Sequence, residues 1–476
     1  MNTRQVDVAV IGAGSAGLSA YRAARQEKEN VVLIEGGAYG TTCARVGCMP
    51  SKLLIAAAEA AHHAREASMF GVHADPVRID GRAVMKRVRS ERDRFVGFVV
   101  ESTEAIPAED RIHGCARFLD PHTLQVGDDI RVEARAIVIA TGSRPQLPAL
   151  FEPAGDRVVV NDDIFSWQDL PESAAVFGPG VIGLELGQAL HRLGVRIRLF
   201  GRSGRVGPLT DPALQDSARN IFAAEFPLST PASVESISRD GDRVIVRFAD
   251  GDGDVQEERF DCLVAATGRI PNVDRLALEN TGLALDENGV PTFDRNTMQC
   301  GDSGIFIAGD ASDDLQLLHE ASDEGRIAGA NAAHPENIRP GKRRSMINVV
   351  FSDPQIALIG RTRKELEGHD IVIGAVDFGG QGRSRVMAQN RGLLHVYADA
   401  ATGRFLGAEM VGPRAEHLAH LLAWAHQQQL RITDMLAMPF YHPVIEEGLR
   451  TALQDAQRQL NEQSSNGAQE TKTASA

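Results

Sequence analysis

Two cysteines, Cys43 and Cys48, are separated by four residues in a short segment that ends in Pro-Ser-Lys. This spacing fits one helical turn, in which β-carbons on one face lie about 5–6 Å apart. A modest distortion would bring them to the roughly 3.5–4.5 Å of a disulfide. Pro50 suits an early helix position, and a helix N-terminus stabilises a thiolate. The pair is therefore interpreted as a redox-active disulfide.

Two alternatives are that both cysteines are simply buried and reduced, or that they form half of a zinc site. The chain has no second cysteine pair and no His-x3-His group with ligand spacing, which disfavours zinc. Cys115, Cys262 and Cys300 stand alone, and burial is their default interpretation. We therefore predict no metal site.

The chain of 476 residues carries 50 Lys and Arg against 64 Asp and Glu, a formal net charge of −14. This acidic balance argues against nucleic acid or an anionic membrane as a partner. The N-terminus enters a strand-like run without a signal peptide, and no stretch approaches the roughly 18 apolar residues of a membrane span. We expect a cytoplasmic protein, in which a disulfide is more often catalytic or redox-sensing than structural.

A glycine-rich turn precedes the cysteines. The apolar run Val6–Ile11 leads into Gly12, Gly14 and Gly17, and a helical pattern and a second strand follow, ending in Glu35. In a dinucleotide fingerprint these glycines serve the tight turn, the approach of the pyrophosphate and the packing of helix on strand, and the acid binds ribose hydroxyls. This combination predicts a dinucleotide site.

The pattern repeats in the middle of the chain. Gly178, Gly180 and Gly183 follow a second strand-like run, and the next strand ends near Arg202 and Arg205 where an acid is usual. Arginines there are typical of sites that accept a 2′-phosphate, whereas Gly183 at the third position is more usual for NAD. The sequence leaves NAD and NADP both open, and either arginine could equally be a solvated surface charge.

Three further turns follow buried strands. Two read Ala-Thr-Gly, at Thr141-Gly142 and at Gly268, and one reads Gly-Asp, ending in Asp310. A glycine at the end of a buried strand permits close approach of a ligand.

In this order, and with a late His442-Pro443, the motifs resemble those of the flavoprotein disulfide reductases, or pyridine nucleotide-disulfide oxidoreductases. The resemblance covers roughly residues 5 to 458. It implies an α/β fold with two Rossmann-like FAD- and NAD(P)-binding domains and an α+β C-terminal dimerisation domain. The expected boundaries are 1–150 for FAD and the dithiol, 151–270 for NAD(P), 271–345 for a central domain completing the FAD site, 346–460 for dimerisation, and 461–476 for a disordered tail.

The resemblance also implies roles for the reacting residues. Cys43 would exchange with substrate, and Cys48 would lie against the flavin. Lys52 resembles the lysine near flavin N5, with Glu185 as its partner.

The other implied roles concern the cofactors and the base. His442 with Glu447 resembles a His-Glu dyad supplied across a homodimer interface, where an imidazole with a pKa of about 6.5 suits proton removal from a thiol. The residues implied to hold FAD are Gly12, Gly14, Gly17, Glu35, Lys52, Thr141, Gly142 and Asp310. Those implied to hold NAD(P) are Gly178, Gly180, Gly183, Arg202 and Gly268.

The activity that this set implies is oxidation of dihydrolipoamide, free or on a lipoyl-bearing protein, with FAD bound and NAD as acceptor. The alternative is an NADPH-dependent reductase of another disulfide or of a metal ion, motivated by Arg202 and Arg205. A third, non-catalytic hypothesis is a flavin-bound subunit that docks onto a large complex.

Overall fold

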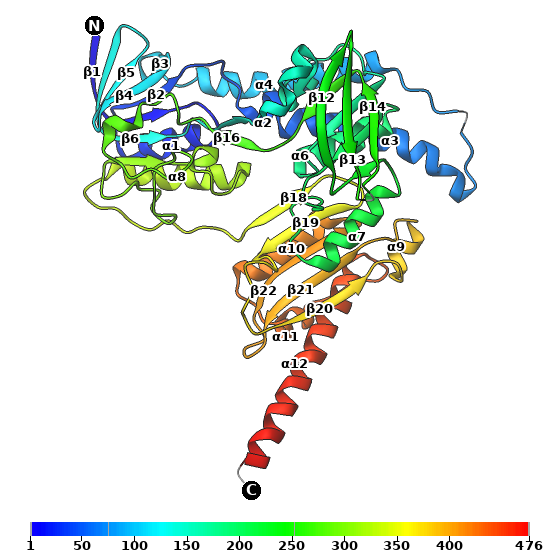
Figure 1. The fold of residues 1–476 in the computed structure, drawn as a ribbon. Helices are drawn as coiled ribbons and strands as arrows, with labels where there is room; N and C mark the ends of the chain where they lie inside the picture. Colours follow the sequence, from blue (N-terminus) through cyan, green and yellow to red (C-terminus); the bar gives the residue numbers. More distant parts are fainter. Residues whose placement is uncertain (1, 75, 252, 475–476) are drawn as a thin grey trace.

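The computed structural model describes residues 2–74, 76–251 and 253–474, with side chains described to residue 465. Two nucleotide-binding parts form the upper body of Figure 1, and a third sheet with its helices forms the lower one. The fold is mixed α/β, as predicted.

The first part is built on a seven-stranded sheet in the order β3-β2-β1-β6-β5-β4, with β17 also paired to β6. Its central strands are parallel and almost wholly apolar where they are buried, as expected for a sheet covered on both faces. The strands are β1 (Asn2–Ile11), β2 (Val31–Glu35), β3 (Arg111–His113), β4 (Ala116–Asp120), β5 (Thr123–Val126), β6 (Ile130–Ile139) and β17 (Ile305–Ile307).

Helices α1 (Ser15–Glu27) and α8 (Leu318–Ala333) lie side by side on this sheet (Figure 1). Their close packing requires glycine at positions 325 and 329, because a β-carbon on Gly325 would overlap the carbonyl oxygen of Ala16, and one on Gly329 that of Ala20. A segment three hundred residues downstream thereby completes the first nucleotide-binding part.

The second part repeats the design with a parallel five-stranded sheet in the order β11-β10-β9-β15-β8. An antiparallel three-stranded sheet, β12-β13-β14, covers one side of it. The strands are β8 (Val158–Val160), β9 (Ser173–Phe177), β10 (Arg196–Phe200), β11 (Leu228–Ser229), β12 (Ser233–Asp240), β13 (Arg243–Ala249), β14 (Val255–Phe260) and β15 (Cys262–Ala265), and the helices are α5 (Asn161–Ile164), α6 (Val181–Arg192) and α7 (Pro212–Ala223).

The two parts are joined by a short antiparallel ribbon of β7 (Ser143–Pro145) and β16 (Arg269–Pro271). Three helices lie beside these two parts: α2 (Thr42–Val46), α3 (Cys48–Glu66) and α4 (Gly81–Glu104). The cysteine segment belongs to α2 and α3. Short 3₁₀ turns complete the connections: η1 (Ala67–Phe70), η2 (Ala108–Asp110), η3 (Ala149–Arg157), η4 (Leu278–Thr281) and η5 (Gly309–Ser312).

The C-terminal part is an antiparallel five-stranded sheet in the order β18-β19-β22-β21-β20, packed against α10 and α12. Its strands are β18 (Ile347–Val350), β19 (Gln355–Gly360), β20 (Ile371–Asp377), β21 (Leu393–Asp399) and β22 (Phe405–Gly412), and its helices are α9 (Gly382–Val386), α10 (Ala415–Gln427), α11 (Ile432–Leu436) and α12 (Glu446–Ala474).

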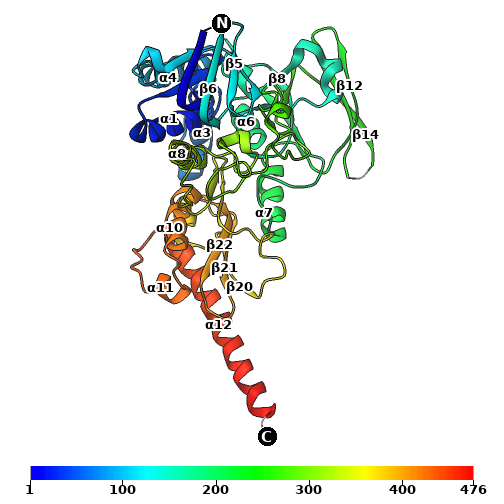
Figure 2. The same cartoon turned by 90° about the vertical axis from the view of Figure 1, so that its left-hand side faces the viewer.

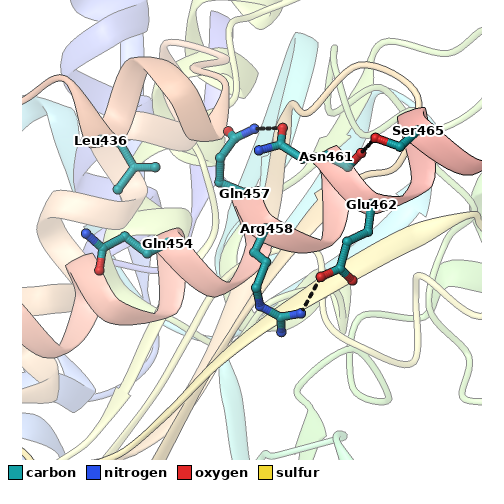
Figure 3. A pocket seen from close by; sticks show the side chains of 7 residues that line it. All are labelled: Leu436, Gln454, Gln457, Arg458, Asn461, Glu462 and Ser465. Atoms are coloured by element: carbon teal, nitrogen blue, oxygen red, sulfur yellow. Dashed lines mark hydrogen bonds and ion pairs between the residues drawn. The ribbon is translucent and has the colours of Figure 1, made fainter.

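The last helix differs from the predicted disordered tail over 461–476. Helix α12 continues to Ala474 and projects beyond the sheet in both views (Figures 1 and 2). Leu460 is still buried in the core of this part, and one-turn pairs such as Arg458 with Glu462, at 2.8 Å, support the next turns. Figure 3 shows these pairs beside a groove of about 680 Å³ between Leu436 and α12.

Within the described residues, no helix is both long and apolar enough to cross a membrane.

Candidate active site

The two cysteines interpreted as a redox pair lie on separate helices. Cys43 belongs to α2, and Cys48 is the first residue of α3, so the single helical turn predicted for them is wrong. Gly47 interrupts the helix with φ −125° and ψ −118°, and a β-carbon there would crowd the Cys43 Cα at 3.2 Å. The interruption folds the two thiols toward each other and leaves Cys48 at a helix N-terminus.

The structure holds both cysteines as free thiols, and it makes them unequal. A hydrogen bond from Cys43 and the positive charge of Lys52 lower the pKa of Cys48 to about 7, while the same bond and burial raise the pKa of Cys43. Cys48 therefore carries the negative charge of the reduced pair.

Lys52 stands one turn after Cys48 on α3, and its ammonium contacts two residues. Its Nζ donates to both carboxylate oxygens of Glu185 on α6, at 3.0 and 2.8 Å, and lies 4.6 Å from the ring centre of Phe351. The Glu185 side chain is 4% exposed and also accepts from the backbone N–H of Phe351 at 2.9 Å. These contacts join three parts of the chain beside the thiols.

The first glycine loop has the geometry of a dinucleotide site. A β-carbon at Gly12 would overlap the carbonyl oxygen of Ala140, and one at Gly17 that of Gly12, whereas Gly14 has open space around it. Gly14 is the N-cap residue of α1 and offers no side chain to cap the helix, so the backbone N–H groups of the first turn are available to a phosphate. The residues present therefore fit an FAD pyrophosphate.

Glu35 lies beside this loop. Its carboxylate accepts from the backbone N–H groups of Ala13 and Gly37, both at 2.7 Å. The carboxylate is thus held at the end of β2, where ribose hydroxyls are bound in such folds.

The turn after β6 adds two features that fit the same cofactor. Gly142 has a φ of +68°, and the buried hydroxyl of Thr141 has no hydrogen-bond partner among the described residues. Asp310, in η5, accepts from Ser143 Oγ at 2.7 Å, and Arg269 donates to the same hydroxyl at 2.7 Å. Asp310 is therefore held by Ser143, and Arg269 Nε lies 3.9 Å from the same carboxylate oxygen.

The second glycine loop repeats the first. A β-carbon at Gly178 would overlap the carbonyl oxygen of Ala266, one at Gly183 that of Gly178, and Gly180 again has open space and begins a helix without a side-chain cap. Gly268 lies in the neighbouring turn with φ +114°. These residues fit the pyrophosphate of a pyridine nucleotide.

Arg202 and Arg205 lie on the loop after β10. Both are exposed, and neither has an ion-pair or hydrogen-bond partner within the described ranges. A guanidinium without an internal partner is available to a phosphate group.

His442 and Glu447 lie on the C-terminal part, at the start of α12. His442 Nδ1 lies 2.9 Å from Glu447 Oε2, and Arg450 donates to the other carboxylate oxygen at 3.2 Å. The His442 side chain is 81% exposed. In Figure 1, α12 belongs to the lower body and α2 to the upper one.

Sequence reasoning missed three residues that support the site. Arg269 and Ser143 hold Asp310, and buried Asn161 donates to the carbonyl of Val46 at 2.9 Å, which anchors the end of α2. The sequence signal for Ser143 and Arg269 is their position, since each directly follows an Ala-Thr-Gly turn. The described residues contain no cluster of His, Cys, Asp and Glu that could hold a metal ion.

Comparison with known proteins identifies two family regions. Residues 6–325 match the family described as pyridine nucleotide-disulphide oxidoreductase. Residues 346–453 match the dimerisation domain of the same family.

Several curated relatives match over nearly the whole chain. Dihydrolipoyl dehydrogenase 2 of Haloarcula marismortui is 32% identical, covering 94% of this chain and 96% of the relative. A mercuric reductase of Streptomyces lividans is also 32% identical, covering 94% and 95%. The structure of the HOCl-induced flavoprotein disulfide reductase RclA from Escherichia coli, as a Cu(II) complex, has a TM-score of 0.78 at 24% identity, covering 95% of this chain and 99% of that one. The last match supports the fold.

Proposed function

Because this chain belongs to the pyridine nucleotide-disulphide oxidoreductase family, and is thus an FAD-dependent disulfide oxidoreductase, we propose that it oxidises a dithiol through Cys43 and Cys48, with dihydrolipoamide as substrate and NAD as acceptor. The observation that carries the proposal is the unequal pair of thiols next to the Lys52–Glu185 ion pair. The names of full-length relatives support the choice of substrate.

In the proposed reaction His442, from the second copy of the chain, accepts a proton from a substrate thiol. The substrate thiolate attacks Cys43 Sγ of the disulfide, a mixed disulfide forms, and Cys48 leaves as a thiolate. A thiol with a lowered pKa is a good leaving group, which suits the pKa of Cys48 at about 7.

The second substrate thiol then attacks the substrate sulfur of the mixed disulfide. Cys43 is expelled and takes up the proton of this second thiol, while His442 keeps the proton of the first thiol and so balances the charge of the Cys48 thiolate. The substrate leaves as a disulfide, and the enzyme keeps two electrons on its reduced pair of cysteines. When bound, FAD supplies the two-electron link between this dithiol and the pyridine nucleotide. Lys52 keeps a positive charge beside Cys48 throughout.

The family's dimerisation domain makes the chain a homodimer. Exposed apolar side chains of the C-terminal part, among them Trp424 on α10 and Tyr441 beside His442, support the proposal that this part meets the second copy.

A second candidate is an NADPH-dependent reductase of another disulfide or of a metal ion. Unpaired Arg202 and Arg205 favour it, as does the similarity to a mercuric reductase. A steady-state comparison of dihydrolipoamide plus NAD with glutathione disulfide plus NADPH separates the candidates, since activity with only the latter pair would refute the first. Unchanged preference between NADH and NADPH in Arg202→Glu would count against the second.

A further inference from the structure

Arg269 donates two hydrogen bonds to one residue, Ser143. Its Nε donates to Ser143 Oγ at 2.7 Å, and its Nη2 donates to the Ser143 carbonyl oxygen, also at 2.7 Å. Ser143 Oγ in turn donates to Asp310 Oδ2 at 2.7 Å. Arg269 therefore determines both where the Ser143 backbone lies and where its hydroxyl points.

The direction of the hydroxyl follows from its proton count. Ser143 Oγ has one proton and accepts the bond from Arg269 Nε, so its own proton is directed to Asp310. Ser143 is buried and the Arg269 side chain is 12% exposed, which keeps water from competing for these bonds. Asp310 Oδ1 has no protein partner among the described residues and remains available to a ligand.

The three residues come from different parts of the fold. Arg269 begins β16 at the edge of the second nucleotide-binding part, Ser143 begins β7, and Asp310 follows β17 of the first sheet. We propose that Arg269 is a positioning residue for FAD, acting from the NAD(P)-binding side by holding Ser143 so that Asp310 presents one oxygen to the cofactor. The inference rests on the proposed role of Asp310 in binding FAD.

The test is the dissociation constant of FAD, measured by the fluorescence change when apoprotein is reconstituted with FAD. Arg269→Met should weaken FAD binding about tenfold, as expected for loss of charge-assisted hydrogen bonds, and Ser143→Ala should have a similar effect. The double variant should be no weaker than the weaker single one, because both remove the same link. Ser143→Thr keeps the hydroxyl and should bind FAD with wild-type affinity, unlike Ser143→Ala.

Arg144→Met is the matched control. Arg144 is the next residue on the same ribbon, and its guanidinium pairs with Asp274 at 2.9 Å and donates to Asn272 Oδ1 at 3.1 Å rather than to Ser143 or Asp310. Its loss should leave FAD affinity unchanged. Additive losses in the double variant, an unaltered affinity in Arg269→Met, or an equal loss in Arg144→Met would each overturn the inference.

Two further variants keep the test decisive. If Arg269→Met does not fold as an apoprotein, Arg269→Lys replaces it, because an ammonium keeps the charge but lacks the fork that binds both oxygens of Ser143, and the same non-additivity is expected. Asp310→Asn separates the inference from its premise. If Asp310→Asn binds FAD with wild-type affinity, the premise that Asp310 contacts FAD is wrong. If Asp310→Asn binds FAD more weakly but Arg269→Met does not, only the role of Arg269 is refuted.

Discussion

Glu447 Oε2 lies 2.9 Å from His442 Nδ1 in a dyad whose imidazole remains 81% exposed. The hydrogen bond with His442 lowers the pKa of Glu447, so the carboxylate stays ionised. When Nδ1 donates to this carboxylate, Nε2 is left as the acceptor and can take a proton from a thiol. An oriented but exposed imidazole is what the proposed reaction requires of a base that serves a second chain.

Subunit mixing tests this arrangement. Cys43→Ser and His442→Ala homodimers should each be inactive, because every site lacks one group. Random reassortment of equal amounts makes half of the dimers mixed, each with one complete site, so about one quarter of the wild-type activity should return. If the proteins stay inactive after verified subunit exchange, the base and the thiols belong to one chain.

The ionisation of Cys48 should be visible in its reaction with an alkylating agent. Its pKa is lowered to about 7, so in the reduced protein the alkylation rate should rise through pH 7 as the thiolate forms. Cys43→Ala removes the hydrogen bond that contributes most to the lowered pKa of Cys48, and Lys52→Met removes the neighbouring positive charge. Both substitutions should move the inflection of the alkylation rate to higher pH. Lys86→Met, at an exposed position on α4, is the control. An identical inflection in Cys43→Ala would contradict this account.

Loss of Lys52 should destabilise the protein through Glu185. Lys52→Met leaves a buried carboxylate with only the Phe351 N–H as partner, at a cost of about 2–3 kcal/mol in the free energy of unfolding. Glu185→Gln in the same chain should recover much of this loss, since the amide is neutral and still accepts from Phe351. Urea unfolding of the apoproteins measures both, and equal stability of the single and double variants would refute the explanation.

Glu324 should make stability depend on pH. Its side chain is fully buried and accepts from the Gly309 N–H at 2.7 Å, and burial raises its pKa from 4.5 to about 7 despite Arg343 at 3.0 Å. A carboxyl whose folded pKa is raised contributes its full stability below pH 4.5 and loses it as pH rises through 7.

Glu324→Gln removes this dependence. Between pH 5 and pH 8 the wild-type free energy of unfolding should fall about 2–3 kcal/mol further than that of the variant. Urea unfolding at the two pH values is the measurement. Parallel behaviour of the two proteins would mean that Glu324 does not titrate in this range.

Local patterns predicted much of the fold. The strand-like run Val6–Ile11 lies within β1, at Asn2–Ile11, and the second strand, expected to end in Glu35, is β2, at Val31–Glu35. Such elements are readable because apolar periodicity and glycine position act within a few neighbouring residues. The resemblance carried by the motifs led to the right family and fold class.

Other features depended on packing that the sequence does not display. The cysteine spacing fitted one turn, but Gly47 packs against Cys43 and divides the segment into two helices. Helix α12 continues past residue 458 because Leu460 reaches the core of the C-terminal part.

The sequence by itself determined the nucleotide-binding motifs, the pair of thiols and the family, since each depends on residue types at short spacing. Only the tertiary structure decided which thiol carries the charge and what holds Asp310. Lys52 meets Glu185 across 133 residues, and Ser143 meets Asp310 across 167. Contacts at that separation arise from the packing of whole sheets and helices, which no local spacing encodes.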